Sequence, residues 1–399
     1  MFQDYTSFAC PNPACSFYNR FSEGNIAHFS WTGKAKHIQR LYCKACRRRF
    51  SSRKGTLRER AKISEEQQVR LLKCFRWGVC DEGTADLAGV DVKTVHFFRD
   101  KAAKRAKIHH DNEAQKLSSS AVECDELYGK YREGKTWIGA AISVPSFLIL
   151  SVVIGARNQA LADRLLAEVG ARCTSLGMIL TDGWRQYWPA VIRVFGRLIR
   201  PRRKEEDRKL KPKKIDLKGA PFYGQVVKKT NQALALVAIE CRALLGTLQE
   251  CLDYLHIYEI GKVIHTTHIE RWWGSLRCNV AALRRRSRCL SFTENTLKAR
   301  VWIFVSLYNW ILPHKTLSRK KAPTTPAMRA GLIDKILSYE EYIRKVVLPT
   351  GVIEDKVTKK LEQINEEEWR KAAQRTRPKP ERQELWKAPS LAQKDEEVA

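Results

Sequence analysis

Apolar residues recur at helical spacing through residues 63–107. The first run ends near Trp77, a short element follows at 84–88, and a third occupies 92–105 after a turn that contains Gly89. Two short helices around a Gly-containing turn, the second of them basic, are typical of a helix-turn-helix, although a generic three-helix packing unit has the same pattern. The side chains expected to be exposed toward DNA on the third element are Lys93, Thr94, His96 and Arg99.

From residue 121 the pattern changes to runs that are rich in β-branched and aromatic residues. Strands are predicted at 121–128, 136–144, 147–155 and 177–181, with a helix at 159–169. Three strands, a helix and a fourth strand form an α/β pattern in which the last strand can lie parallel to the first.

Residues 136–156 carry no charge, and this length matches a membrane span. Pro145-Ser146 lies at the middle of the segment, and charged residues flank it closely. We therefore predict a β-hairpin rather than a transmembrane helix.

The remaining pattern is mainly helical. Helices are predicted at 183–195, 230–258, around Glu270 and at 294–312, and the serines at 118–120 suggest a linker. The tail beyond Glu340 is highly charged and predicts a solvated helix or an interaction arm.

The charge of the chain indicates a polyanionic partner. Lys and Arg number 73 against 43 Asp and Glu among 399 residues, a formal net charge of +30. Twelve cations lie in residues 34–62 and twelve in residues 193–218. Separate basic stretches favour nucleic acid over an anionic membrane. The start of the chain lacks a signal peptide pattern, so we expect a reducing, cytoplasmic compartment.

Four of the twelve cysteines have the spacing of metal ligands. The pairs Cys10 and Cys15, and Cys43 and Cys46, each allow one turn to present two thiolates to a Zn²⁺ ion. This spacing predicts a zinc ribbon with one structural Zn²⁺, and cysteines that merely pack are the alternative. The second pair runs into cations expected to contact phosphate, namely Arg47, Arg48 and Arg49.

Three carboxylates stand at positions where chemistry is expected. Asp125 is expected at the end of the first predicted strand, and Asp182 directly follows the apolar run of the fourth. If these strands are neighbours, their ends bring both carboxylates together around Mg²⁺ or Mn²⁺. Asp182 can instead cap the next helix, and Glu270 can form a helix capping box with Thr267. On a helix Glu270, Trp273 and Arg277 share one face, which suits a DNA end with Trp273 stacked on a frayed base.

These acidic motifs resemble those of DDE transposases of the insertion-sequence-one (IS-one) family. The motifs are Asp125-Glu126-Leu127-Tyr128, Thr181-Asp182-Gly183-Trp184 and His268-Ile269-Glu270-Arg271 with Arg277 seven residues on. The ribbon cysteines, the helix-turn-helix and Leu290-Ser291-Phe292 are similar to that family too, so the resemblance covers about residues 10–312.

The resemblance implies a two-metal transposase. Asp125, Asp182 and Glu270 would be catalytic and would hold two Mg²⁺ or Mn²⁺ ions in an RNase H-like (DDE/integrase) core. These ions would support nicking of the transposon ends and joining of the 3′-OH ends to target DNA. The implied partner is double-stranded DNA, both transposon ends and target, with no membrane partner. We expect a homodimer or higher homo-oligomer, associated with a prokaryotic nucleoid. Further expected DNA contacts are Arg271, Trp273, Arg277 and Arg285.

The chain departs from the family in one interval. Eighty-seven residues separate Asp182 from Glu270, which makes residues 190–263 a basic, mostly helical insertion. The expected domains are a zinc ribbon at 1–58, an all-α helix-turn-helix domain at 59–112, the catalytic core at 118–314, and a charged, partly helical C-terminal extension at 315–399.

Other functions remain open on sequence grounds. His268 and Arg271 form an H-x-x-R pattern, and with Tyr308 they allow a metal-independent tyrosine recombinase. A DNA-binding regulator with an inactive transposase-like core is a second alternative, and a junction or RNA nuclease is a third.

Overall fold

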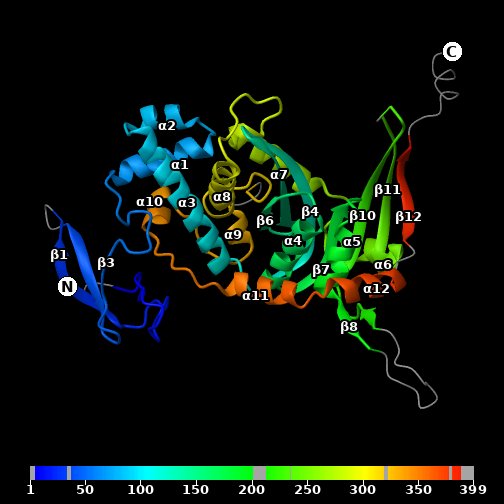
Figure 1. The fold of residues 1–399 in the computed structure, drawn as a ribbon, viewed down its shortest axis with the longest axis horizontal. Helices are drawn as coiled ribbons and strands as arrows, with labels where there is room; N and C mark the ends of the chain where they lie inside the picture. The colour runs from blue at the N-terminus through cyan, green and yellow to red at the C-terminus, as the bar shows by residue number, and fades with distance from the viewer. Residues whose placement is uncertain are drawn as a thin grey trace. The chain divides into compact units, whose positions relative to one another are not determined.

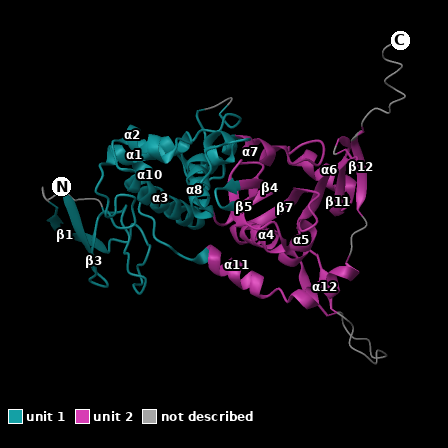
Figure 2. Ribbon diagram, turned by 45° about the horizontal axis from the view of Figure 1, so that its top comes forward, with its two compact units in different colours: residues 1–113, 130–134, 275–352 teal, residues 114–129, 135–274, 353–399 magenta. Residues whose placement is uncertain are grey.

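The computed structural model describes residues 5–33, 37–200, 213–233, 235–318, 322–376 and 380–387. The chain divides into two compact units, and the division falls inside two strands and two helices. The first unit comprises residues 1–113, 130–134 and 275–352, and the second comprises residues 114–129, 135–274 and 353–399 (Figure 2). The first division, after residue 113, lies next to the predicted bound at 112, and residues 275–352 group with the N-terminal segments. The predicted domain bounds stay a prediction.

The first unit contains a small sheet and a set of packed helices. The antiparallel sheet is formed by β1 (Ile26–Thr32), β2 (Ile38–Cys43) and β3 (Arg49–Ser51). The helical elements are α1 (Glu65–Arg76), α2 (Asp81–Ala88), α3 (Val92–Glu113), the 3-10 turn η1 (Ala281–Leu283), α8 (Glu294–Trp310), α9 (Pro326–Arg329) and α10 (Tyr339–Arg344).

Local sequence explains the helices of residues 65–113. A capping box between Ser64 and Gln67 begins α1. Gly89 adopts a φ of 62° at the end of α2, a left-handed conformation that favours glycine. α3 packs along α8 and is bound to α10 through Arg105, whose Nη2 donates to the Tyr342 carbonyl at 2.8 Å. The predicted helices of residues 63–107 are confirmed, and α3 continues to Glu113.

The second unit is built on a seven-stranded mixed sheet with the order β12-β11-β10-β7-β4-β5-β6. The strands are β4 (Leu117–Tyr131), β5 (Gly134–Ser143), β6 (Ile149–Gly155), β7 (Cys173–Asp182), β10 (Phe222–Thr230), β11 (Leu236–Leu245) and β12 (Glu381–Lys387). A separate pair is formed by β8 (Arg197–Ile199) and β9 (Lys214–Asp216). The helices are α4 (Gln159–Arg172), α5 (Tyr187–Phe195), α6 (Leu248–Ile257), α7 (Thr267–Asn279), α11 (Val352–Glu362) and α12 (Glu366–Arg375).

Strand pairing confirms the predicted α/β pattern. β4 pairs with β7 in parallel, and β5 with β6 as the predicted hairpin. The serines at 118–120 are not a linker, because they lie inside β4, where Ser119 Oγ lies 2.8 Å from Ser143 Oγ. Among the described residues, no helix combines the length and the hydropathy needed to cross a bilayer.

The prediction that residues 190–263 are mostly helical, with one helix over 230–258, is wrong. β10 pairs in parallel with β7, and β11 returns antiparallel to it, so β10 and β11 lie side by side in the sheet (Figure 1). A turn at Asn231, whose Oδ1 accepts from the Ala235 N–H at 2.9 Å, joins the two strands. The apolar run of β11 suits a buried strand or a helix equally, and pairing with β10 decides it. Residues 201–212, which carry six of the twelve cations in the basic stretch 193–218, lie outside the described residues.

The C-terminal segment is partly helical, as predicted, but it is not merely a solvated arm. Trp369 on α12 is buried with Ile192 and Ile215 in a small apolar cluster. β12 pairs with β11 and so adds the edge strand of the large sheet. Backbone pairing of β12 and burial of Trp369 therefore attach the C-terminal segment to the second unit, although its charge pattern predicts an exposed segment.

Candidate functional site

Two parallel strands place two acidic side chains beside each other. In the pairing of β4 with β7, Cys124 lies opposite Thr181, and each strand continues with an aspartate, Asp125 and Asp182. Carboxylate oxygens of Asp125, Glu126 and Asp182 all lie within 4.8 Å of one another. Asp125 is not at a strand end, because β4 continues to Tyr131, but it lies where β7 ends.

The carboxylates in this cluster disfavour each other's charge. Burial raises the pKa of Asp125 to about 7, and the nearby charge of Asp182 adds to the shift. Burial also raises the pKa of Asp182. Burial and then the charge of Asp182 raise the pKa of Glu126, and hydrogen bonding to Arg157 opposes this rise. Such a cluster is stabilised by a bound cation.

Glu126 is the third member of the cluster, and its sequence pattern predicts no separate role for it. Its Oε1 accepts from Arg157 Nε at 2.9 Å, and its Oε2 accepts from the Tyr187 hydroxyl at 3.0 Å. The Arg157 guanidinium in turn lies 4.5 Å and 4.9 Å from the ring centroids of Trp137 and Trp184. Adjacency to Asp125 was the only sequence signal for Glu126, and its partners come from distant segments.

Trp273 positions Asp125. The indole Nε1 of Trp273 donates to Asp125 Oδ2 at 2.9 Å, and the Trp273 side chain is only 3% exposed. The expectation that Trp273 is an exposed platform for a DNA base is therefore wrong. Glu270 on the same helix stays about half exposed, whereas the Trp273 ring is buried and its N–H finds an acceptor on β4.

Glu270 completes the acidic site from helix α7. It lines a cavity of about 750 Å³ together with Asp125 and Asp182. Its carboxylate Oε1 accepts from Lys228 Nζ at 3.0 Å. The other cations that line this cavity are Arg157 and Arg185. The structure thus brings the three predicted acids to one cavity that also holds cations suited to phosphate.

A buried carboxylate fixes the start of α7 against β4. Glu123 is fully buried, with Oε1 lying 2.6 Å from His268 Nδ1 and Oε2 accepting from the Ile269 N–H at 2.8 Å. Burial would raise the pKa of Glu123, but hydrogen bonds to His265 and His268 lower it below its ordinary value. Glu123 lies two residues before Asp125 on β4, and its partners His268 and Ile269 directly precede Glu270 on α7. These hydrogen bonds therefore position Glu270 relative to Asp125. Sequence reasoning missed Glu123, since a glutamate in an apolar strand has no distinguishing pattern.

The donor set of the acidic cavity fits a hard divalent cation. All of its ligating atoms are carboxylate oxygens, which Mg²⁺ and Mn²⁺ prefer, and those of Asp125, Glu126 and Asp182 lie within 4.8 Å of one another. Asp125, Asp182, Glu270 and Glu126 are the residues that can hold such ions.

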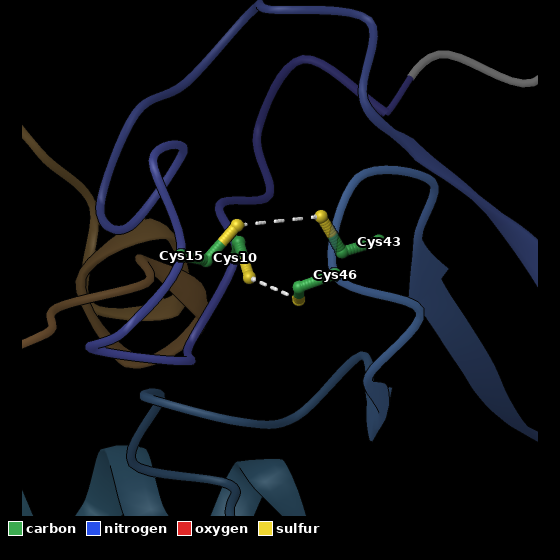
Figure 3. Close-up of side chains that lie close together, drawn as sticks. All are labelled: Cys10, Cys15, Cys43 and Cys46. Atoms are coloured by element: carbon green, nitrogen blue, oxygen red, sulfur yellow. Dashed lines mark hydrogen bonds between the residues drawn. The ribbon is translucent and has the colours of Figure 1, made fainter.

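The four predicted cysteines converge in the first unit (Figure 3). The Sγ atoms of Cys10 and Cys46 lie 3.6 Å apart, and those of Cys15 and Cys43 lie 3.9 Å apart. Four sulfurs at about 2.3 Å from a tetrahedral Zn²⁺ are separated by about 3.8 Å, so the geometry fits zinc.

The surroundings of the cysteines support the same coordination. The Arg47 N–H donates to the Cys43 carbonyl at 2.8 Å, which closes the turn that carries Cys43 and Cys46. Asn25 Nδ2 donates to Cys43 Sγ at 3.3 Å, a contact that stabilises a thiolate.

The cations predicted near this centre are exposed. Arg47, Arg48 and Arg49 all lie on the surface. The Arg49 guanidinium lies 3.9 Å from the ring centroid of Phe29, an exposed aromatic on β1. A cation held over an exposed aromatic ring suits contact with nucleic acid.

The predicted contacts on α3 divide into two groups. Lys93 is exposed, and Thr94 and His96 are partly exposed. Arg99 is buried, and its Nη1 donates to Asp81 Oδ2 at 2.8 Å. The expectation that Arg99 is exposed is wrong, because the buried carboxylate of Asp81 requires a cation beside it.

Other predicted positions lie on or after α7. Arg271 and Arg285 are exposed, and Arg277 is partly buried. Tyr308, the nucleophile of the recombinase alternative, is buried in α8, and this burial raises the pKa of its hydroxyl. A raised pKa makes the phenolate harder to form, which disfavours nucleophilic attack by Tyr308.

No family model matches the chain, and no curated protein matches it. Among solved structures the chain is similar to the piggyBac transposase in a cryo-EM synaptic complex with hairpin DNA. The sequence identity is 8% and the TM-score 0.36, over 85% of this chain and 80% of that chain. A TM-score at this level does not establish a shared fold, so function is inferred from the site's own geometry.

Proposed function

We propose that the chain is a DDE transposase that binds the terminal inverted repeats of an insertion sequence, nicks the ends and joins them to target DNA. The observation that carries this proposal is the meeting of Asp125, Asp182 and Glu270 at one cavity lined by cations. Paired or triple carboxylates of this kind are the protein's part of metal-assisted phosphoryl transfer.

The order of strands supports an RNase H-like core. Five neighbouring strands have the order β6-β5-β4-β7-β10. β5 and β6 form a hairpin, and β7 pairs in parallel with β4 on one side and with β10 on the other. In this reading β10, inside the interval that the sequence marks as an insertion, is the fifth core strand. The membership of the IS-one family remains part of the proposal.

Each residue of the cavity has a role in the proposed reaction. Divalent ions, when bound, would lower the pKa of the attacking hydroxyl and stabilise the leaving oxygen. Asp125 and Asp182 would hold them from the sheet, and Glu270 from α7. The Trp273 indole keeps Asp125 oriented by its hydrogen bond. Arg157 and Arg185 line the cavity where they can contact DNA phosphates.

The first unit would hold the DNA ends. The Cys10, Cys15, Cys43 and Cys46 centre would stabilise the ribbon through one Zn²⁺, and the adjacent arginines would contact phosphates. Lys93, Thr94 and His96 of α3 would face the duplex. Pairing of two ends in one complex would require a homodimer or a larger homo-oligomer.

The test uses duplex oligonucleotides made from the DNA that flanks the reading frame. Wild-type protein should bind inverted repeats there and nick them with Mg²⁺ or Mn²⁺. Asp182→Asn should lower the nicking rate by about a hundred- to a thousandfold while end binding is unchanged. Asp253→Asn, an exposed aspartate on α6, is the matched control and should nick normally. Metal dependence should be tested by omitting metal, because a chelator would also extract zinc.

The outcomes separate the alternatives. Binding of the ends without nicking in either metal would support the regulator, which keeps the DNA-binding modules but not the chemistry. Undiminished nicking by Asp182→Asn would contradict the assignment of the metal site. A covalent DNA adduct through Tyr308 would establish the recombinase instead.

A further inference from the structure

A lysine lies within the acidic cavity and contacts one of its carboxylates. Lys228 lines the cavity, and its Nζ lies 3.0 Å from Glu270 Oε1. β10 carries it there, because Val226 pairs with Asp182 across the parallel strands and Lys228 follows two residues later on the same face. The charge of Lys228 also acts on Asp182, where it opposes the rise in the Asp182 pKa that burial causes.

The next residue provides a contrast within the same strand. Lys229 points to the opposite face of the sheet, where it contacts Glu240 of the neighbouring strand β11. Glu240 is not among the described residues that line the acidic cavity. The two adjacent lysines have similar exposure, but only Lys228 faces the site, and the Glu240 partner of Lys229 is only 10% exposed.

The Lys228 contact is one that a metal ion can replace. Both partners are largely exposed, with 57% of the Lys228 side chain and 47% of the Glu270 side chain accessible. Exposed ion pairs contribute little to stability, because water solvates each partner almost as well. A divalent ion bound by Glu270 would compete with the ammonium for the same oxygen, and its higher charge would repel the ammonium at short range.

The long side chain allows the ammonium to move without leaving the cavity. Lysine carries a compact charge on a flexible four-carbon stem with three donors, and it contacts phosphate as a point charge. Among the described lining residues, the acids Asp125, Asp182 and Glu270 are matched by three cations, and without metal the Lys228 ammonium pairs with Glu270. Once that charge is neutralised, the nearest strong anion in a DNA complex is a backbone phosphate.

We propose that the Lys228 ammonium pairs with the Glu270 carboxylate when no metal is bound. Binding of a divalent ion would displace the ammonium, which would then contact a phosphate of the strand to be cut. This makes Lys228 both a competitor of metal loading and a phosphate-binding residue. The second half of the inference rests on the proposed function, whereas the first half concerns only the metal centre.

The first experiment measures Mn²⁺ affinity in the absence of DNA, by electron paramagnetic resonance of the free ion at low salt. Lys228→Met keeps the apolar stem and removes the charge, and Lys229→Met is the matched control. We expect Lys228→Met to bind Mn²⁺ about three- to tenfold more tightly than wild type, and Lys229→Met to bind as wild type does. The gain should shrink as salt rises. Equal affinity in wild type and Lys228→Met would overturn the exchange.

The second experiment measures nicking at saturating Mn²⁺ on a duplex end. Lys228→Met should be slower by about ten- to a hundredfold despite its tighter metal binding, and Lys228→Arg should recover part of the rate. Normal nicking by Lys228→Met would overturn the phosphate role. If wild type binds Mn²⁺ but nicks no DNA, the proposed function fails while the affinity comparison still decides the exchange. Mn²⁺ binding that is insensitive to Asp125→Asn and Asp182→Asn would overturn both.

Discussion

Replacing Asp125 by asparagine should stabilise the metal-free protein at neutral pH while it removes metal binding. In the folded chain Asp125 keeps its proton until about pH 7, whereas the ordinary value is 3.8. Between these values the folded state binds more protons than the unfolded state, so stability falls as pH rises from about 4 to about 7. Asparagine carries no such charge and can still accept the Trp273 hydrogen bond.

The magnitude follows from the size of the shift. A rise from 3.8 to about 7 is about three pKa units, and each unit is worth about 1.36 kcal/mol. The full value of about 4 kcal/mol is an upper bound, because the neighbouring acids titrate together with Asp125 and share its proton. We expect a gain of about 1–3 kcal/mol above pH 7, or about 2–10 °C in the unfolding transition of the second unit.

The assay is thermal unfolding followed by circular dichroism at pH 5 and pH 8, without Mg²⁺, Mn²⁺ or chelator. Asp125→Asn should exceed wild type by more at pH 8 than at pH 5, because wild type carries the full charge penalty only above pH 7. Added Mg²⁺ should raise the transition of wild type and leave Asp125→Asn unmoved. Asp253→Asn serves as the control.

Two results would refute this reasoning. One is a gain in Asp125→Asn that is the same at pH 5 and pH 8, which would mean that ionisation of Asp125 does not strain the fold. The other is a gain of equal size in Asp253→Asn, which would assign the effect to net charge.

Three further substitutions test other parts of the structure. Cys43→Ala should lower bound zinc from one ion per chain to none, measured by elemental analysis, and should unfold the ribbon first on heating, since structural zinc supplies folding free energy. Trp273→Phe removes the hydrogen bond to Asp125 and should weaken Mn²⁺ binding about tenfold in the resonance assay, with unchanged DNA binding; an unchanged Mn²⁺ affinity would show that Asp125 needs no such support. Arg99→Ala removes one of the two arginines, Arg99 and Arg300, that pair with the buried Asp81. It should lower the free energy of unfolding by about 1–3 kcal/mol in a denaturant titration, whereas a loss of DNA affinity at unchanged stability would restore Arg99 as a surface contact.

Local spacing alone determined several parts of this protein. Two cysteine pairs, each on one turn, require no distant contact to be recognised, and the structure brings all four together. The hairpin around Pro145-Ser146 and the helices at 63–107 follow from short-range backbone preferences. The prediction that Asp125 and Asp182 lie together follows from the strand pattern, although Asp125 lies inside β4 and meets Asp182 where β7 ends.

Tertiary structure decided the features that depend on partners far along the chain. Residues 236–245 form a strand because β10 offers them hydrogen-bond partners, although their apolar pattern suits a helix too. Trp273 and Arg99 are polar-tipped or charged side chains of a kind found at DNA surfaces, and each is buried because one carboxylate, Asp125 or Asp81, accepts its hydrogen bond. A polar or charged side chain is buried only where a partner accepts its hydrogen bond or balances its charge, and that partner comes close only when the chain has folded.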